Sequence, residues 1–166
     1  MHHPQHFQPI IDFIQAIGVP VTEQALPAST FLPGVAIRGG GLVVDADKLL
    51  WPGDLLHEAG HLAVMPETLR RCAEDDLPGV NDIEHAGEQE AMAWAYAAAV
   101  ALGIPLDVLI HEDGYNGNAS GLLQMYAFGV FPGLRGLCAS GMTAAPGFTS
   151  DCGPLRYPQM LRWLRD

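Results

Sequence analysis

Apolar residues recur at the spacing of one helix face near the start of the chain. Ile or Phe occupies positions 10, 13, 14 and 17, which predicts a short helix over 9–17 that ends at Gly18. A second apolar segment begins at Pro52 and Asp54, residues that favour the first turn of a helix, and it continues to Met65. We therefore expect a second helix over this segment.

An alanine-rich segment further along predicts the longest helix of the chain. Asn81 and Glu84 have the spacing of a capping box, and Gly103 followed by Pro105 marks the end of the helix. The remaining predictions are a loop over 103–118, short helices over 120–130 and 132–140, an irregular segment over 141–154 and a terminal helix over 158–165.

A β-hairpin is predicted between the first two helices. Val35–Arg38 and Leu42–Asp45 are short apolar segments, and three glycines at 39–41 separate them. No repeat or linker divides the 166 residues. We therefore expect a single domain over 1–166 of the α+β class, mostly helical, with a small hairpin or sheet ahead of the helix that begins at Pro52.

The charge of the chain limits its partners. Lys and Arg number 8 against 19 Asp and Glu, the formal net charge is -11, and no Lys or Arg lies between Cys72 and Leu134. Nucleic acids and anionic lipids are bound largely by cations that neutralise phosphate, so we expect neither nucleic acid nor membrane as a partner. A basic protein or peptide fits the charge better.

The cysteines and the N-terminus favour the cytoplasm. Cys72, Cys138 and Cys152 are widely spaced and form no C-x-x-C pair, which predicts buried thiols rather than disulfides or a thiolate zinc site. The first residues lack the charged and then apolar order of a secretory signal. We therefore expect a cytoplasmic protein.

The segment His57-Glu58-Ala59-Gly60-His61 matches the pattern H-E-x-x-H within the second predicted helix. Residues four apart lie on one helix face, so His57 and His61 can present two imidazole nitrogens to one tetrahedral zinc ion. Zinc lowers the pKa of a bound water toward about 7, and Glu58 would take its proton as the water attacks a carbonyl carbon. The motif therefore predicts a zinc site with Glu58 as general base.

A catalytic zinc site needs a third protein ligand, and the next predicted helix can supply it. Glu84 has a capping role in that helix, and His85 lies in its solvated first turn. Glu88 and Glu90 remain, on faces about 200° apart. Small residues follow on both faces, so helix periodicity leaves both glutamates as candidates.

The order of these features resembles the ImmA/IrrE family of short gluzincin metallopeptidases over about residues 30–140. The hairpin and the motif at His57 are followed by the segment Glu88-Gln-Glu-Ala91-Met-Ala-Trp94-Ala95, which is similar to the second motif of the family in the register that begins at Glu88. The resemblance implies a zincin-like domain, a bound Zn²⁺ ion and Glu88 as its third ligand.

One position of that motif differs from the family. The Asn or Asp of the family falls on Met92, and such a residue would normally orient a zinc-bound imidazole. We expect that Met92 cannot do this, so that either another group, a backbone carbonyl or Asp54, orients the ring, or the site is weakened.

Three interpretations are consistent with these residues. The first is a zinc-dependent metallopeptidase in which Glu58 is general base and then proton donor to the leaving amine, with His111, Tyr115 or Tyr126 as possible donors to the oxyanion. Its substrate would be a protein or peptide, and the resemblance implies that a transcriptional regulator is one candidate. The alternatives are a non-hydrolytic regulatory module that binds its partner through the same fold, and a structural domain with a fortuitous motif.

Overall fold

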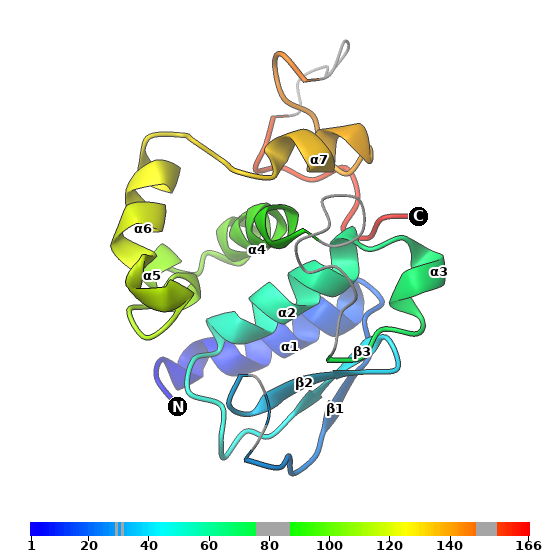
Figure 1. Ribbon diagram of the computed structural model, residues 1–166, viewed down its shortest axis with the longest axis vertical. Helices are drawn as coiled ribbons and strands as arrows, with labels where there is room; N and C mark the ends of the chain where they lie inside the picture. Colours follow the sequence, from blue (N-terminus) through cyan, green and yellow to red (C-terminus); the bar gives the residue numbers. More distant parts are fainter. Residues whose placement is uncertain (29, 31, 76–86, 149–155) are drawn as a thin grey trace.

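The computed structural model describes residues 1–28, 30, 32–75, 87–148 and 156–166 (Figure 1). These residues form a small sheet with helices stacked over it, which confirms the α+β class. In chain order the elements are η1 (Pro4–His6), α1 (Phe7–Ala16), β1 (Val21–Glu23), β2 (Val35–Arg38), β3 (Gly41–Val44), α2 (Gly53–Val64), α3 (Glu67–Arg70), α4 (Glu88–Leu102), α5 (Leu106–Leu109), η2 (Tyr115–Gly117), α6 (Ala119–Ala127) and α7 (Leu134–Ala139).

The sheet has the strand order β1-β3-β2. Strands β2 and β3 form the predicted antiparallel hairpin, in which Arg38 pairs with Gly41 across the two glycines of the turn. Strand β1 was not predicted and pairs parallel with β3, from Val21 opposite Leu42. Its three residues include two exposed ones, so its sequence lacks the apolar alternation that identifies a strand.

Helix α2 lies at the centre of the fold. It packs on α1 and the sheet on one side and on α4 on the other (Figure 1). Ten of its twelve residues are buried. The two that are partly exposed are His57 and Glu58, so the only part of α2 that solvent reaches is the part that carries the motif.

Helices α2 and α4 approach each other closely at Gly60. A Cβ on Gly60 would lie 2.6 Å from the carbonyl oxygen of Ala91 and 3.2 Å from its Cα, so no larger residue fits there without moving one of the backbones. Helix α4 contains many other buried alanines and ends at Gly103, which has φ 65°.

None of the helices in the described part of the chain combines the length and the apolar character that a bilayer span requires.

The predicted terminal helix over 158–165 is wrong. The segment is irregular, and its backbone groups bond to distant segments: Leu161 N–H donates to Met142, and Arg165 N–H donates to Ala63. The carbonyl of Trp163 accepts a hydrogen bond from Nε1 of Trp94, and the two indoles pack edge to face. These long-range bonds replace the local ones that a helix would need.

Most of the other predicted helices are confirmed, and the predicted loop and cysteine burial are confirmed only in part. Helices α1, α2, α6 and α7 are confirmed, but the predicted loop over 103–118 contains the short helices α5 and η2. Helix α4 is confirmed from Glu88 onward, and its predicted capping box at Asn81 and Glu84 lies outside the described residues. Cys138 is buried as predicted, Cys72 is exposed, and Cys152 lies outside the described residues.

The close approach at Gly60 gives a test of this packing. Substitution Gly60→Ala should lower the free energy of unfolding by about 1–3 kcal/mol, since the added methyl group meets backbone atoms that cannot rotate away. Urea titration followed by circular dichroism measures this change.

The matched control is Gly121→Ala in α6, where the added Cβ would meet mainly the side-chain end of Asn118. This control should leave stability unchanged or raise it by up to about 1 kcal/mol, because alanine is the better helix former. An equal loss in both variants would contradict a special constraint at Gly60.

Candidate metal centre

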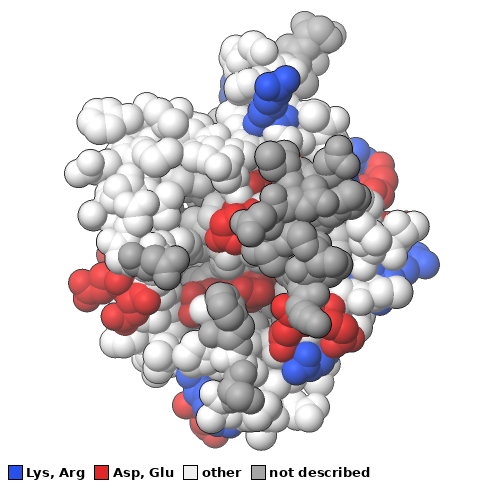
Figure 2. Space-filling view, viewed as in Figure 1, with Lys and Arg blue, Asp and Glu red and all other residues white. Residues whose placement is uncertain are grey.

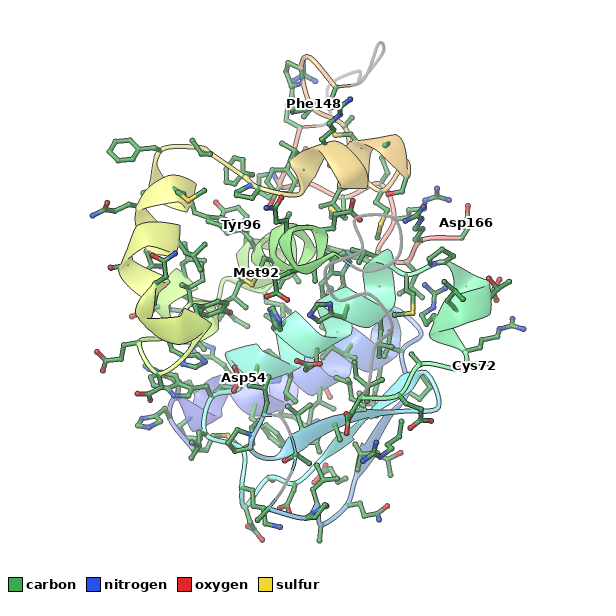
Figure 3. The ribbon with its side chains drawn as sticks, viewed as in Figure 1. Asp54, Cys72, Met92, Tyr96, Phe148 and Asp166 are labelled. Carbon is green, nitrogen blue, oxygen red and sulfur yellow. The ribbon has the colours of Figure 1, made fainter. Side chains whose placement is uncertain are left out.

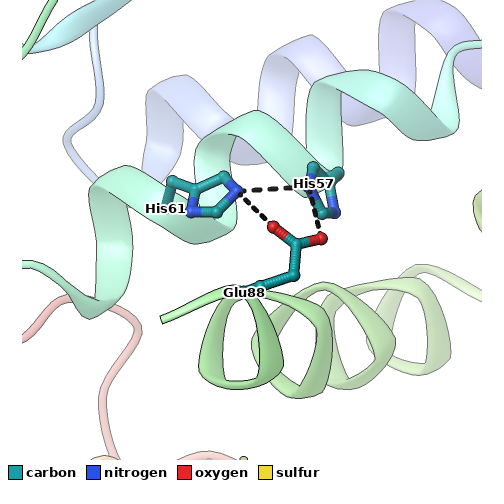
Figure 4. A group of neighbouring side chains, drawn as sticks. All are labelled: His57, His61 and Glu88. Carbon is teal, nitrogen blue, oxygen red and sulfur yellow. Dashed lines mark hydrogen bonds and ion pairs between the residues drawn. The ribbon is translucent and has the colours of Figure 1, made fainter. Parts of the chain in front are cut away.

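Three predicted ligands come together between α2 and α4 (Figure 4). His57 and His61 extend from one face of α2, and Glu88 extends toward them from the first residue of α4. The two Nε2 atoms are 3.2 Å apart, and each lies 3.3 Å from one carboxylate oxygen of Glu88. This group is able to hold a metal ion.

Helix packing explains why Glu88 faces the two histidines. Gly60, next to His61, contacts the backbone of Ala91, which lies one turn after Glu88 on α4. This contact holds the first turn of α4 directly against the middle of α2. The carboxylate of Glu88 therefore reaches both imidazoles from across the helix interface.

The other candidate, Glu90, lies on a different side of α4. Its carboxylate is buried against α7, where a Cβ on Gly136 would lie 1.7 Å from Oε1 of Glu90. Burial raises the pKa of Glu90, with Arg165 opposing the shift. The structure thus groups Glu88 and not Glu90 with the histidines, while Glu84 and His85 lie outside the described residues.

The electrostatic environment keeps His57 and Glu88 in the forms that bind a cation. Burial, together with the neighbouring His61, lowers the pKa of His57 to about 4, so its imidazole is neutral at pH 7. Burial would raise the pKa of Glu88, but the hydrogen bond from His61 and the attraction between the carboxylate and the protonated forms of His57 and His61 outweigh it and place the pKa below the ordinary value. Neutral imidazole and ionised carboxylate are the forms that bind metals.

Met92 occupies the position at which a polar residue was expected to orient a histidine (Figure 3). Its sulfur lies 3.0 Å from Nδ1 of His57, so the tautomer that is protonated on Nδ1 donates to the thioether and leaves the lone pair of Nε2 facing Glu88 and His61. The expectation that Met92 has no part in orienting the ring is therefore wrong. A thioether is, however, a weak acceptor compared with a carboxylate or an amide oxygen.

Asp54 was considered from the sequence as a group that orients a zinc-bound imidazole, but its partner in the structure is His111. Its Oδ1 lies 2.9 Å from Nε2 of His111, and both side chains are buried. The ring of His111 also stacks on Trp51, with centroids 4.6 Å apart and an interplanar angle of 2°. Asp54 thus fixes His111, a residue 57 positions away, which reasoning from helix spacing could not find.

The three candidate oxyanion donors all line the same cavity. His111 directs Nε2 at Asp54, and its Nδ1 is buried without a hydrogen-bond partner in the described part of the chain. The hydroxyl of Tyr115 donates to the carbonyl of Leu109 at 2.9 Å, and its ring lies edge-on to His57. The hydroxyl of Tyr126 is buried and has no partner among the described residues. The hydrogen bonds of His111 and Tyr115 are thus made to Asp54 and Leu109 and not to the three candidate ligands.

Glu58 lines the same cavity, beside the group of three ligands. Burial raises the pKa of Glu58 to about 7, and the carboxylates of Asp54 and Glu88 add to this shift. The cavity has a volume of about 910 Å³, and its described walls include residues of α2, α4, α6, the chain before α2 and the segment 111–115. The structure therefore combines a potential metal site, a carboxylate of raised pKa and space for a ligand.

No protein-family model, curated protein or solved structure matches the chain. The resemblance to the ImmA/IrrE family and the zincin-like character of the fold stay predictions from the sequence. The functional interpretation therefore depends on the geometry of the site.

The grouping of His57, His61 and Glu88 predicts one divalent metal ion per chain. His61→Ala should abolish binding, and Glu88→Gln should weaken it by at least about tenfold, because each substitution removes a converging ligand. Inductively coupled plasma mass spectrometry on untagged, dialysed protein measures the number of metal ions per chain.

Glu90→Gln is the matched control, since it makes the same chemical change on the same helix, away from the ligands. It should keep one ion per chain. Loss of the ion in Glu90→Gln with retention in Glu88→Gln would contradict the assignment.

The contact between Met92 and His57 predicts that metal affinity can be tuned from this position. Met92→Asn should tighten binding by about tenfold, because an amide oxygen is a stronger acceptor for Nδ1–H than a thioether. Met92→Leu, which keeps the volume and removes the acceptor, should weaken it. Competition with a chromogenic chelator ranks the three proteins, and equal affinities would show that the contact has no effect on the metal.

Proposed function

We propose that the protein is a zinc-dependent metallopeptidase whose metal ligands are His57, His61 and Glu88. The observation that carries the proposal is the spacing of the three ligand atoms, 3.2 and twice 3.3 Å. Zinc bonds of about 2.0–2.1 Å in a tetrahedron separate the ligand atoms by about 3.3–3.4 Å. The side chains thus already have nearly the spacing that a tetrahedral zinc ion needs.

The chemistry of the ligands also supports zinc. Two imidazole nitrogens with one carboxylate suit zinc better than magnesium or calcium, which prefer oxygen ligands alone. The tautomer of His57 that donates from Nδ1 to Met92 presents its Nε2 lone pair to Glu88, 3.3 Å away, and this is the form of the imidazole that binds a cation.

In this proposal the metal activates water and the substrate, and a protein side chain beside the site transfers the proton. A zinc ion bound there supplies a Lewis acid that lowers the pKa of water and polarises a peptide carbonyl. Glu58 is next to His57 in the sequence and lines the cavity in which a substrate would lie. It takes the proton of the attacking water and then gives that proton to the leaving nitrogen.

The environment of Glu58 suits this double role. Burial raises its pKa to about 7 in the metal-free protein, with His61 opposing the shift and Asp54 and Glu88 adding to it. Exchange of the proton needs access, and Glu58 is one of the two residues of α2 that are not fully buried. The partial exposure of Glu58 on an otherwise buried helix supports a catalytic role.

One observation favours the second candidate, a partner-binding module that does not hydrolyse. The weak thioether acceptor on His57 gives less support to a ligand than an amide or carboxylate would. Such a site holds its metal less tightly than one with a polar residue at that position. The intact Glu58 has no purpose in a module of this kind, and we therefore place hydrolysis first.

Substitution Glu58→Gln separates these two functions. In a peptidase it should lower kcat/KM by about 10²–10⁴-fold while one zinc ion per chain is retained, because the amide cannot accept the proton of water. Mass spectrometry of a proteome-derived peptide library, incubated with zinc-loaded wild-type protein and with the variant, measures the change. Cleavage that persists in Glu58→Gln, or is insensitive to chelator, would refute the mechanism.

A further inference from the structure

The described lining of the cavity contains five carboxylates and many apolar side chains, together with three histidines and Gln89. No Lys or Arg is among the described lining residues, and the sequence contains none between Cys72 and Leu134. On the face shown in Figure 2, Asp and Glu atoms lie in the middle as well as near the margin, and Lys and Arg atoms lie toward the margin. The lining carboxylates are those of Asp54, Glu58, Asp75, Glu88 and Asp113.

Two of these carboxylates already have partners within the chain. Asp54 is paired with His111. Asp75 accepts a hydrogen bond from the backbone N–H of Ile37 at 2.6 Å and forms an ion pair with Arg38 at 3.0 Å. Both carboxylates are thus held by contacts with other parts of the chain.

Asp113 differs from the others. Glu58 and Glu88 belong to the proposed catalytic centre, whereas the contact that the structure gives to Asp113 is a hydrogen bond from the neutral indole of Trp51, 3.0 Å from Nε1 to Oδ2. No cation of the described chain pairs with it. Asp113 is exposed and lies at the edge of the cavity, so its charge is accessible to a ligand that enters.

The indole that holds Asp113 is itself fixed. His2 stacks on Trp51 with centroids 4.3 Å apart, and His111 stacks on it at 4.6 Å. Because His111 is in turn bonded to Asp54 on α2, the position of Asp113 is tied to the helix that carries His57. A rigid support of this kind lets a single carboxylate select one charge at a defined distance from the metal centre.

We propose that Asp113 binds the Lys or Arg side chain of a peptide substrate while the peptide lies in the cavity. The inference rests on the proposed function, because it assigns a substrate class to the same site. An ammonium or guanidinium group donates to the open oxygen of Asp113 and places its aliphatic stem on the apolar wall. An acidic side chain in that place meets Asp113 and is repelled.

The experiment measures binding separately from cleavage. Fluorescein-labelled apolar peptides, each with one Lys moved stepwise along the chain and a matched Gln peptide for each, are titrated with zinc-loaded Glu58→Gln protein, and anisotropy gives the affinity. We expect one Lys peptide to bind about five- to tenfold more tightly than its Gln partner, a preference that falls in high salt.

Asp113→Asn should remove this preference and retain the Trp51 hydrogen bond, since the amide oxygen still accepts. The matched control is Asp107→Asn in α5, which changes the net charge equally at an exposed residue away from the cavity lining, and it should keep the preference. Equal affinities of all Lys and Gln pairs, undetectable binding of every Lys peptide, or an equal effect of the two variants would overturn the proposal.

Cleavage by wild-type protein, measured with the same peptides, distinguishes the two hypotheses. Lys-selective binding that depends on Asp113, without any cleavage, would support the basic subsite and refute the hydrolytic function. Cleavage of Lys and Gln peptides at equal rates would support hydrolysis and overturn the subsite.

Discussion

The close approach of α2 and α4 at Gly60 and Ala91 is the contact on which the candidate site depends. It brings the first turn of α4 against the middle of α2, so that Glu88 faces His57 and His61. A side chain at position 60 would separate the backbones, and ligand atoms now 3.2–3.3 Å apart would no longer converge. The absence of one Cβ thus determines whether three ligands form one site.

The same packing explains the electrostatics of the site. Because α2 is surrounded by the sheet, α1 and α4, its polar residues are largely removed from water. Burial keeps His57 neutral and raises the pKa of Glu58, and these are the states that metal binding and proton transfer require. The charge that burial disfavours on Glu58 is a cost to stability, in keeping with the usual conflict between a functional site and a stable core.

Local patterns predicted most helices and the hairpin but failed where the chain bonds to distant segments. Strand β1 exists because its backbone pairs with β3, about twenty residues later, and not because of its own composition. The segment around Trp163 lacks the expected helix because its backbone groups bond to Ala63, Met142 and Trp94. Competition of this kind between local and long-range hydrogen bonds cannot be read from periodicity.

The sequence by itself determined the pairing of His57 with His61, since residues four apart on a helix lie on one face whatever surrounds them. It also limited the third ligand to Glu88 or Glu90. Only the tertiary structure decided between these two, because the choice depends on how α4 is rotated against α2. Likewise, the pairing of Asp54 with His111 and of Trp51 with Asp113 joins residues about sixty positions apart, and such distances are set by packing rather than by local sequence.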